Sequence, residues 1–151
     1  MTSLTDDHLA RLVSRVTETM TGISFSASSA RTIDAALLSH TALLTIGEGI
    51  LTVGLGSDEN GCSKLGSALF CCAAASVDAS MRDDSLRELV NMTAGQIKRA
   101  LVLDWALGLP KVFAGGAIPD AEALRKVRLQ SSGVEMVLLL SELKPTMERR
   151  K

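Results

Sequence analysis

The segment Asp84-Ser-Leu-Arg-Glu-Leu-Val-Asn-Met-Thr-Ala-Gly-Gln-Ile-Lys-Arg-Ala-Leu101 carries the clearest helical pattern in the chain. Its apolar and small residues recur every three or four positions, as in a helix that buries one stripe. These residues are Leu86, Leu89, Val90, Thr93, Ile97, Ala100 and Leu101. A second stripe, which we call the polar stripe, consists of Asp84, Glu88, Asn91, Gly95 and Lys98. The segment therefore predicts a helix with one face toward a core. Its other face is polar and has no side chain at Gly95.

Length and composition predict a single domain over residues 1–151, because 46% of the residues are apolar and can form a core. The net charge of −1 argues against a nucleic-acid partner, and we interpret the locally basic end, 144–151, as a solvated tail. Charged residues interrupt the apolar positions at the N-terminus, and no uncharged apolar run approaches a membrane span. We therefore expect a cytoplasmic protein without a membrane partner.

The three cysteines are Cys62, Cys71 and Cys72. Their number is odd and no C-x-x-C pair occurs, so we expect reduced thiols and neither a disulfide framework nor a metal site. The adjacent pair lies in an apolar stretch, and we expect both of its residues to be small core residues.

The first half of the chain predicts a helix, a hairpin and a second helix. Thr5 is suited to cap a helix over 5–21, and Gly22 is suited to end it. The patterns that follow predict a short strand at 23–28, a strand over 33–46, a turn at 47–49, a returning strand at 50–55, a loop at 57–61, a helix over 63–77 and a link at 78–83.

After the helix of the opening segment, the pattern becomes extended. We expect a turn and strand over 101–109 ended by Pro110, an extended stretch at 112–113, turns at 115–116 and 119–120, and a hairpin of strands 124–130 and 134–140. Adjacent hairpins favour an α+β fold with a mainly antiparallel sheet of about six strands and long helices packed on it.

No standard catalytic motif accompanies these elements: the sequence contains no Walker loop, G-x-G-x-x-G, H-E-x-x-H or G-x-S-x-G. His8 and His40 are isolated, and a structural or solvent-exposed position is the simpler interpretation of both. The polar stripe remains as the candidate site. Its first half also matches a capping box, in which Ser85 caps the helix and Glu88 reaches back to its backbone N–H.

Spacing alone favours this capping box, and in that interpretation Asn91 is a solvated surface residue. Asn91 and Gly95 are nevertheless poor choices for a helix that serves structure only, because asparagine is a mediocre helix former and glycine costs about 1 kcal/mol relative to alanine. A face that another protein approaches closely would gain from the glycine.

The segment from Glu88 to Lys98, with Leu107-Gly-Leu-Pro110-Lys-Val-Phe-Ala-Gly115, resembles the CheX branch of the CheC/CheX/FliY family of chemotaxis phosphatases. Asp84, Glu88, Asn91 and Pro110 match the family's positions for an Asp or Ser, a Glu, an Asn and a downstream Pro. The resemblance extends to the end of the first predicted helix, Val16-Thr-Glu-Thr-Met-Thr-Gly22, and so spans most of the chain.

The resemblance implies a CheC/CheX-like fold and a hydrolase that removes the phosphoryl group from the aspartate of a CheY-like response regulator. Asn91 would orient the attacking water, and Glu88 would pair with the regulator's active-site lysine. Asp84, Gly95, Lys98 and Pro110 would contact the partner. No cofactor is implied for this chain, because the regulator would supply the Mg²⁺.

Two departures from the family pattern bear on activity. The 18 residues between Asn91 and Pro110 form a shorter connection than is usual, and Gln96 stands where asparagine is usual. The sequence contains a single E-x-x-N pair, as CheX proteins do. The resemblance to CheX proteins also implies a homodimer. A non-catalytic module that binds receiver domains, or a dimerisation domain of the same fold, is the alternative.

Overall fold

A computed structural model describes residues 4–30, 32–115, 118–119 and 121–142. Its strands form one antiparallel sheet in the order β1-β5-β6-β3-β2-β4. The strands are β1 (Ser26–Ala27), β2 (His40–Ile46), β3 (Leu51–Ser57), β4 (Lys111–Ala114), β5 (Arg125–Ser131) and β6 (Val134–Leu140). The α-helices are α1 (Asp6–Thr21), α2 (Glu59–Phe70) and α3 (Ala79–Ala100), and the 3₁₀ turns are η1 (Ala35–Leu38), η2 (Ala74–Ser76) and η3 (Ala121–Ala123). The predicted α+β fold with six strands is confirmed.

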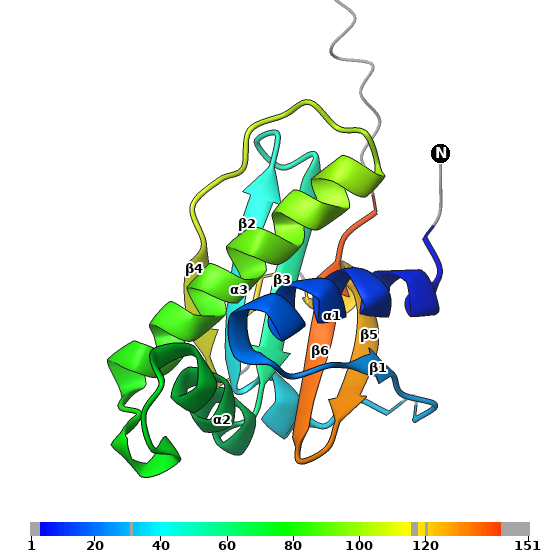
Figure 1. The fold of residues 1–151 in the computed structure, drawn as a ribbon. Helices are drawn as coiled ribbons and strands as arrows, with labels where there is room; N and C mark the ends of the chain where they lie inside the picture. Colours follow the sequence, from blue (N-terminus) through cyan, green and yellow to red (C-terminus); the bar gives the residue numbers. More distant parts are fainter. Residues whose placement is uncertain (1–3, 31, 116–117, 120, 143–151) are drawn as a thin grey trace, which may run out of the picture.

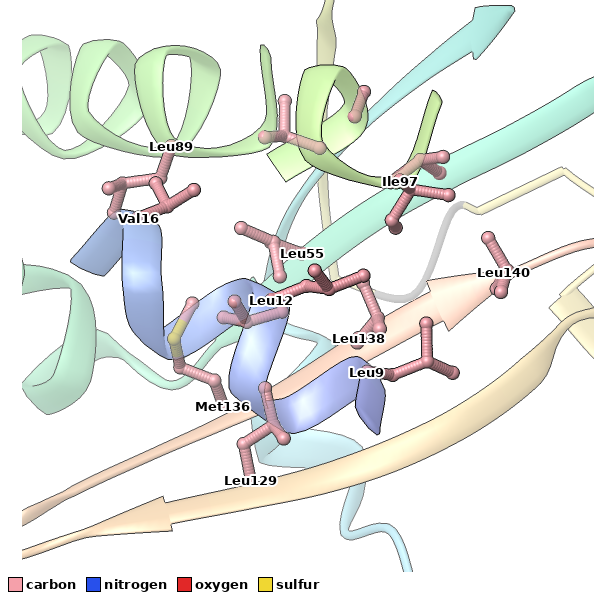
Figure 2. Packing of buried hydrophobic residues seen from close by; sticks show 14 of the residues in the cluster. Leu9, Leu12, Val16, Leu55, Leu89, Ile97, Leu129, Met136, Leu138 and Leu140 are labelled. Carbon is pink, nitrogen blue, oxygen red and sulfur yellow. The ribbon is translucent and has the colours of Figure 1, made fainter. Parts of the chain in front are cut away.

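The helices α1 and α3 lie across one face of the sheet (Figure 1). Between helices and sheet lies the main core, to which α1 contributes Leu9, Leu12 and Val16 (Figure 2). Leu89 and Ile97 of α3 point into the same core, so the apolar stripe of the opening segment faces the sheet. Burial of these side chains is the main force that holds α3 in place, at about 1.5–3 kcal/mol for each large apolar side chain.

Two predicted hairpins are confirmed. Strands β2 and β3 pair from His40–Ser57 to Ile46–Leu51, and residues Gly47, Glu48 and Gly49 of their turn all have positive φ. Strands β5 and β6 pair through the turn at 131–133. Each hairpin joins strands that are adjacent in the sequence, which is why alternation and turn residues were sufficient to predict them.

The strand expected over 33–46 is too long, because residues Ala35–Leu38 form η1 instead. This turn places the buried Leu37 on the face of the sheet away from the helices, in a smaller apolar cluster with Leu43, Ile118, Leu124, Val137 and Leu139. The strand observed within the predicted range 23–28 is also shorter, since β1 covers only Ser26 and Ala27.

The loop expected at 57–61 is wrong. Ser57 ends β3, and Asp58 caps α2 directly by accepting a hydrogen bond from the Gly61 N–H at 2.7 Å. The helix expected over 63–77 therefore begins earlier and ends at Phe70, where Cys71 adopts a left-handed conformation. As a result Cys71 is exposed and Cys72 half-buried, so the expectation that both are core residues is wrong; Cys62 is the buried cysteine.

The expected strand over 101–109 is also wrong, and Pro110 precedes a strand instead of ending one. Residues 101–110 form a loop that makes a single bridge, between Leu107 and Ile46. Strand β4 follows Pro110 and pairs with β2, which confirms the extended stretch at 112–113. A proline at the start of an edge strand removes no ladder hydrogen bond. The predicted turns at 115–116 and 119–120 each include a residue outside the described ones, 116 and 120, and the predicted solvated tail at 144–151 lies wholly outside them.

The helices in the described part of the chain include none that is both long and apolar enough to cross a bilayer.

Candidate functional site

The helix α3 begins at Ala79, five residues before the polar stripe. Asp78 caps it, because its carboxylate accepts a hydrogen bond from the Met81 N–H at 2.9 Å. Ser85 therefore lies within the helix, where its buried hydroxyl donates to the Met81 carbonyl at 2.8 Å. The capping-box interpretation of Ser85 and Glu88 is wrong, since a residue in the second turn has no unsatisfied helix N–H beside it.

The five residues of the polar stripe lie within about 80° of the helix circumference, on the side away from the buried residues. Asp84 is held by its neighbour Arg87, whose Nη1 lies 2.9 Å from the carboxylate. Both side chains are about half exposed, so this ion pair contributes little to stability. The stripe therefore begins with a carboxylate that already has a partner.

Glu88 and Asn91 differ from Asp84 in this respect. Both are exposed, and among the described residues neither side chain has a hydrogen bond or ion pair. They lie one helical turn apart on a rigid element whose opposite face is buried in the core. A carboxylate and a neutral amide thus point to solvent side by side, and both are free to bind a partner.

Gly95 has no packing reason to be a glycine. A Cβ built on it would meet no atom within 4 Å, whereas a Cβ on Gly66 of α2 would lie 2.8 Å from Cγ1 of Val77. Gly66 thus lets α2 and the segment before α3 approach each other, while Gly95 leaves an open patch on the surface. The energetic cost of a glycine within a helix has no compensation inside this chain.

Lys98 completes the stripe and is half-buried, one turn beyond Gly95. Pro110 lies elsewhere, at the start of the edge strand β4, which contacts α3. The structure therefore brings five of the six predicted site residues onto one helix face and leaves Pro110 on a neighbouring element.

Two residues beside the stripe were not predicted as site residues. Met92 is 38% exposed, although it is a large apolar side chain. Arg15 of α1 lies beside α3, with its Nη1 3.5 Å from Oε1 of Gln96. No sequence signal marked Arg15, because the packing of α1 on α3 joins residues that are 81 positions apart.

Two surface pockets lie away from the polar stripe. One, of about 350 Å³, lies on the far face of the sheet and includes Leu43, Leu109 and Phe113 in its walls. The other, of about 360 Å³, lies near the start of α2 and includes Asp58 and Arg128. Neither is lined by Glu88 or Asn91. These two side chains are exposed on the surface of α3, which suits a macromolecular partner. No group of three His, Cys, Asp or Glu side chains that could hold a metal ion occurs within the described ranges.

Comparison with known proteins gives a clear result for the fold only. No model of a protein family matches the chain, and no curated protein matches its sequence. Among solved structures, the chemotaxis protein CheX from Vibrio vulnificus is similar, with a TM-score of 0.71 and 15% identity over 88% of this chain and 95% of that one.

Two further similar structures belong to the same group. A chain of the CheX-CheY-BeF3-Mg complex from Borrelia burgdorferi has a TM-score of 0.63 and 12% identity, over 88% of this chain and 94% of that one. FliY from Thermotoga maritima has a TM-score of 0.60 and 10% identity, over 89% of this chain and 84% of that one. The structural neighbours of this protein are thus CheX- and CheC-like chemotaxis proteins, and the expected CheC/CheX-like fold is confirmed.

Proposed function

We propose that this protein is a phosphatase that acts on the phosphorylated aspartate of a CheY-like response regulator in the cytoplasm. The observation that carries the proposal is that Glu88 and Asn91 are exposed, one turn apart on α3, and without partners among the described residues. The fold supports it, because the similar proteins include CheX in a complex with CheY.

In this proposal Asn91 orients the attacking water. The water oxygen forms a bond to phosphorus as the bond from phosphorus to the aspartate oxygen breaks, which releases inorganic phosphate and a free carboxylate. An uncharged carboxamide can hold the water by hydrogen bonds without repelling the phosphoryl oxygens. Positioning of this kind supplies much of the acceleration in phosphoryl transfer.

Glu88 has a binding role in the same proposal. Its carboxylate pairs with the lysine of the regulator's active site and so fixes the register of α3 on the partner. Gly95 lets the two surfaces approach, and Asp84, Lys98 and Pro110 contact the partner around them. This chain needs no metal of its own, because the regulator brings the Mg²⁺ to which its phosphoryl group is bound.

The test is a dephosphorylation assay with a panel of phosphorylated receiver domains from the same genome. The wild-type protein should accelerate loss of phosphate from at least one of them. Asn91→Ala should abolish the acceleration while the circular dichroism spectrum stays unchanged, because the Asn91 side chain is exposed and has no hydrogen bond among the described residues. Full activity of this variant would exclude the proposed mechanism.

The alternative is a module that binds receiver domains without accelerating hydrolysis. The shortened connection between Asn91 and Pro110 and the presence of Gln96 favour it, since both could alter how a partner docks. A wild-type protein that binds a receiver but leaves its phosphate lifetime unchanged would establish this alternative. We also propose a homodimer, which analytical ultracentrifugation tests.

A further inference from the structure

Met92 connects the polar stripe to α1. Positions 88, 92 and 96 form an i, i+4 row, and each step along it turns about 40° around α3. The row begins at the free carboxylate of Glu88, passes through the thioether of Met92 and ends at Gln96, whose amide oxygen faces Arg15 of α1. The surface next to the proposed site thus continues from α3 onto a second helix.

Met92 is the only large apolar side chain in this row, and it is 38% exposed. It lies three residues before Gly95, whose Cβ position is open. Met92 therefore stands beside a part of the helix surface that no side chain covers. An unbranched methionine adapts its shape to a partner at low cost. Exposed apolar residues at the centre of a polar surface are typical anchors of protein interfaces.

Arg15 supplies a positive charge at the end of the row. Its guanidinium meets only the neutral amide of Gln96, and no carboxylate within the described ranges lies at ion-pair distance from it. Arg11, one turn earlier on α1, is also exposed and unpaired within those ranges. A partner that covers this surface therefore gains most if it places a carboxylate opposite Arg15.

We infer that a receiver domain docks across both helices, with Met92 as the apolar anchor and Arg15 paired with an acidic residue of the receiver. The inference rests on the proposed function for its choice of partner. Charge complementarity favours this partner, because Glu88 suits the receiver's lysine while Arg15 suits an acidic surface, and the two lie at opposite ends of one row. Met92 and Arg15 are docking residues and take no part in hydrolysis.

Calorimetric titration with a receiver domain loaded with beryllofluoride and Mg²⁺ tests the inference. Met92→Ala should weaken binding about ten-fold or more, as expected for an interface anchor. Arg15→Gln should weaken it several-fold and reduce its dependence on salt, because one charge pair is lost. Alanine and glutamine both favour a helix, and Met92 and Arg15 are both exposed, so both variants should fold.

Matched controls separate this surface from general effects. Val102→Ala shortens a side chain that is 88% exposed beyond the end of α3, and Lys64→Gln removes one positive charge from α2. Both should bind within about two-fold of wild type, as is usual for positions outside an interface. Wild-type affinity of Met92→Ala, or equal weakening by the controls, would overturn the inference.

The titration and the dephosphorylation assay together distinguish this inference from the proposed function. A wild-type protein that binds the loaded receiver without accelerating dephosphorylation excludes the phosphatase, while the Met92 and Arg15 variants still decide the docking surface. Conversely, an active enzyme whose Met92→Ala variant binds normally keeps the proposed function and loses the docking surface. Absence of binding to every receiver in the panel overturns both.

Discussion

The hydroxyl of Ser85 donates a hydrogen bond to the carbonyl of Met81, 2.8 Å away and one turn earlier in α3. This contact belongs to the interior of a helix, and it leaves Ser85 unable to act as an N-cap. Glu88 is thereby released from the structural role that its spacing suggested. The helix start is set instead by Asp78.

The first prediction concerns the two acidic residues at this end of α3. Asp78→Ala should lower the free energy of unfolding by about 1 kcal/mol, because it removes the cap. Glu88→Ala should change it by less than about 0.5 kcal/mol, as is usual for exposed positions, and should instead weaken receiver binding. Urea unfolding of both variants measures the difference. The opposite order of stabilities would restore the capping box at Ser85.

The second prediction separates two helical glycines. Gly95→Ala should raise the free energy of unfolding by about 0.5–1 kcal/mol, because its Cβ position is open and alanine favours a helix. Gly66→Ala should lower it by about 1–3 kcal/mol, since the new methyl group would overlap Val77. Thermal and urea unfolding check both values.

A binding measurement completes the test of Gly95. If a partner approaches this helix face closely, the more stable Gly95→Ala variant should bind the receiver less tightly than wild type. Unchanged affinity would show that the glycine does not serve the interface.

The third prediction concerns two fully buried threonines. The hydroxyl of Thr93 in α3 has no hydrogen-bond partner among the described residues, whereas that of Thr17 in α1 donates to the Ile23 carbonyl at 2.7 Å. Thr93→Val should stabilise the protein by about 1 kcal/mol, because it removes an unsatisfied buried hydroxyl. Thr17→Val should destabilise it by about 1–3 kcal/mol, since it leaves a carbonyl unpaired. A loss of stability in Thr93→Val would mean that its hydroxyl has a partner in solution.

The fourth prediction concerns pH. Burial raises the pKa of the Cys62 thiol from 9.0 to about 12, and the nearby Asp58 carboxylate adds to the effect. Between these two pKa values the unfolded chain loses a proton that the folded chain keeps. The contribution of Cys62 to the free energy of unfolding is therefore fully present below pH 9 and is lost as the pH rises toward 12. The slope approaches about 1.4 kcal/mol per pH unit within this window.

Urea unfolding between pH 8 and about 10.5 measures this slope, and the chain contains no tyrosine that would titrate in the same range. Cys62→Ala should remove the contribution, although it also lowers stability through the lost contacts. Cys71→Ala should retain it, since Cys71 is exposed. Equal slopes in all three proteins would contradict the assignment to Cys62.

Much of this fold follows from local patterns. The hairpin of β5 and β6 and the hairpin of β2 and β3 were predicted because strand alternation and the turn residues between the strands are adjacent in the sequence. The faces of α3 were predicted because a period of 3.6 residues alone separates the buried Leu89 from the exposed Glu88. Where two local signals competed, the prediction went wrong. Ser85 and Asp78 are both suitable caps, and the helix begins at the earlier one.

The misplacement of Cys71 and of the segment before Pro110 has a different cause. Composition predicted a buried helix around Cys71. The helix ends there instead, because Cys71 adopts a left-handed conformation, and the chain returns so that Val77 packs against Gly66. Residues 101–109 read as a strand because they are apolar, yet Trp105 packs on the turn at Gly47, and β2 pairs with β4 instead. Both outcomes depend on contacts between elements, which local patterns do not contain.

Spacing along the chain was enough to place Glu88, Asn91 and Gly95 on one face of a helix, because helical geometry depends only on spacing. The exposure of this face, with its carboxylate and amide free, depends on packing, since burial of the opposite stripe against the sheet orients α3. The tertiary structure alone also brought Arg15 beside Gln96. Contacts of this kind are set by the packing of one helix on another, and that packing depends on the whole core rather than on either segment.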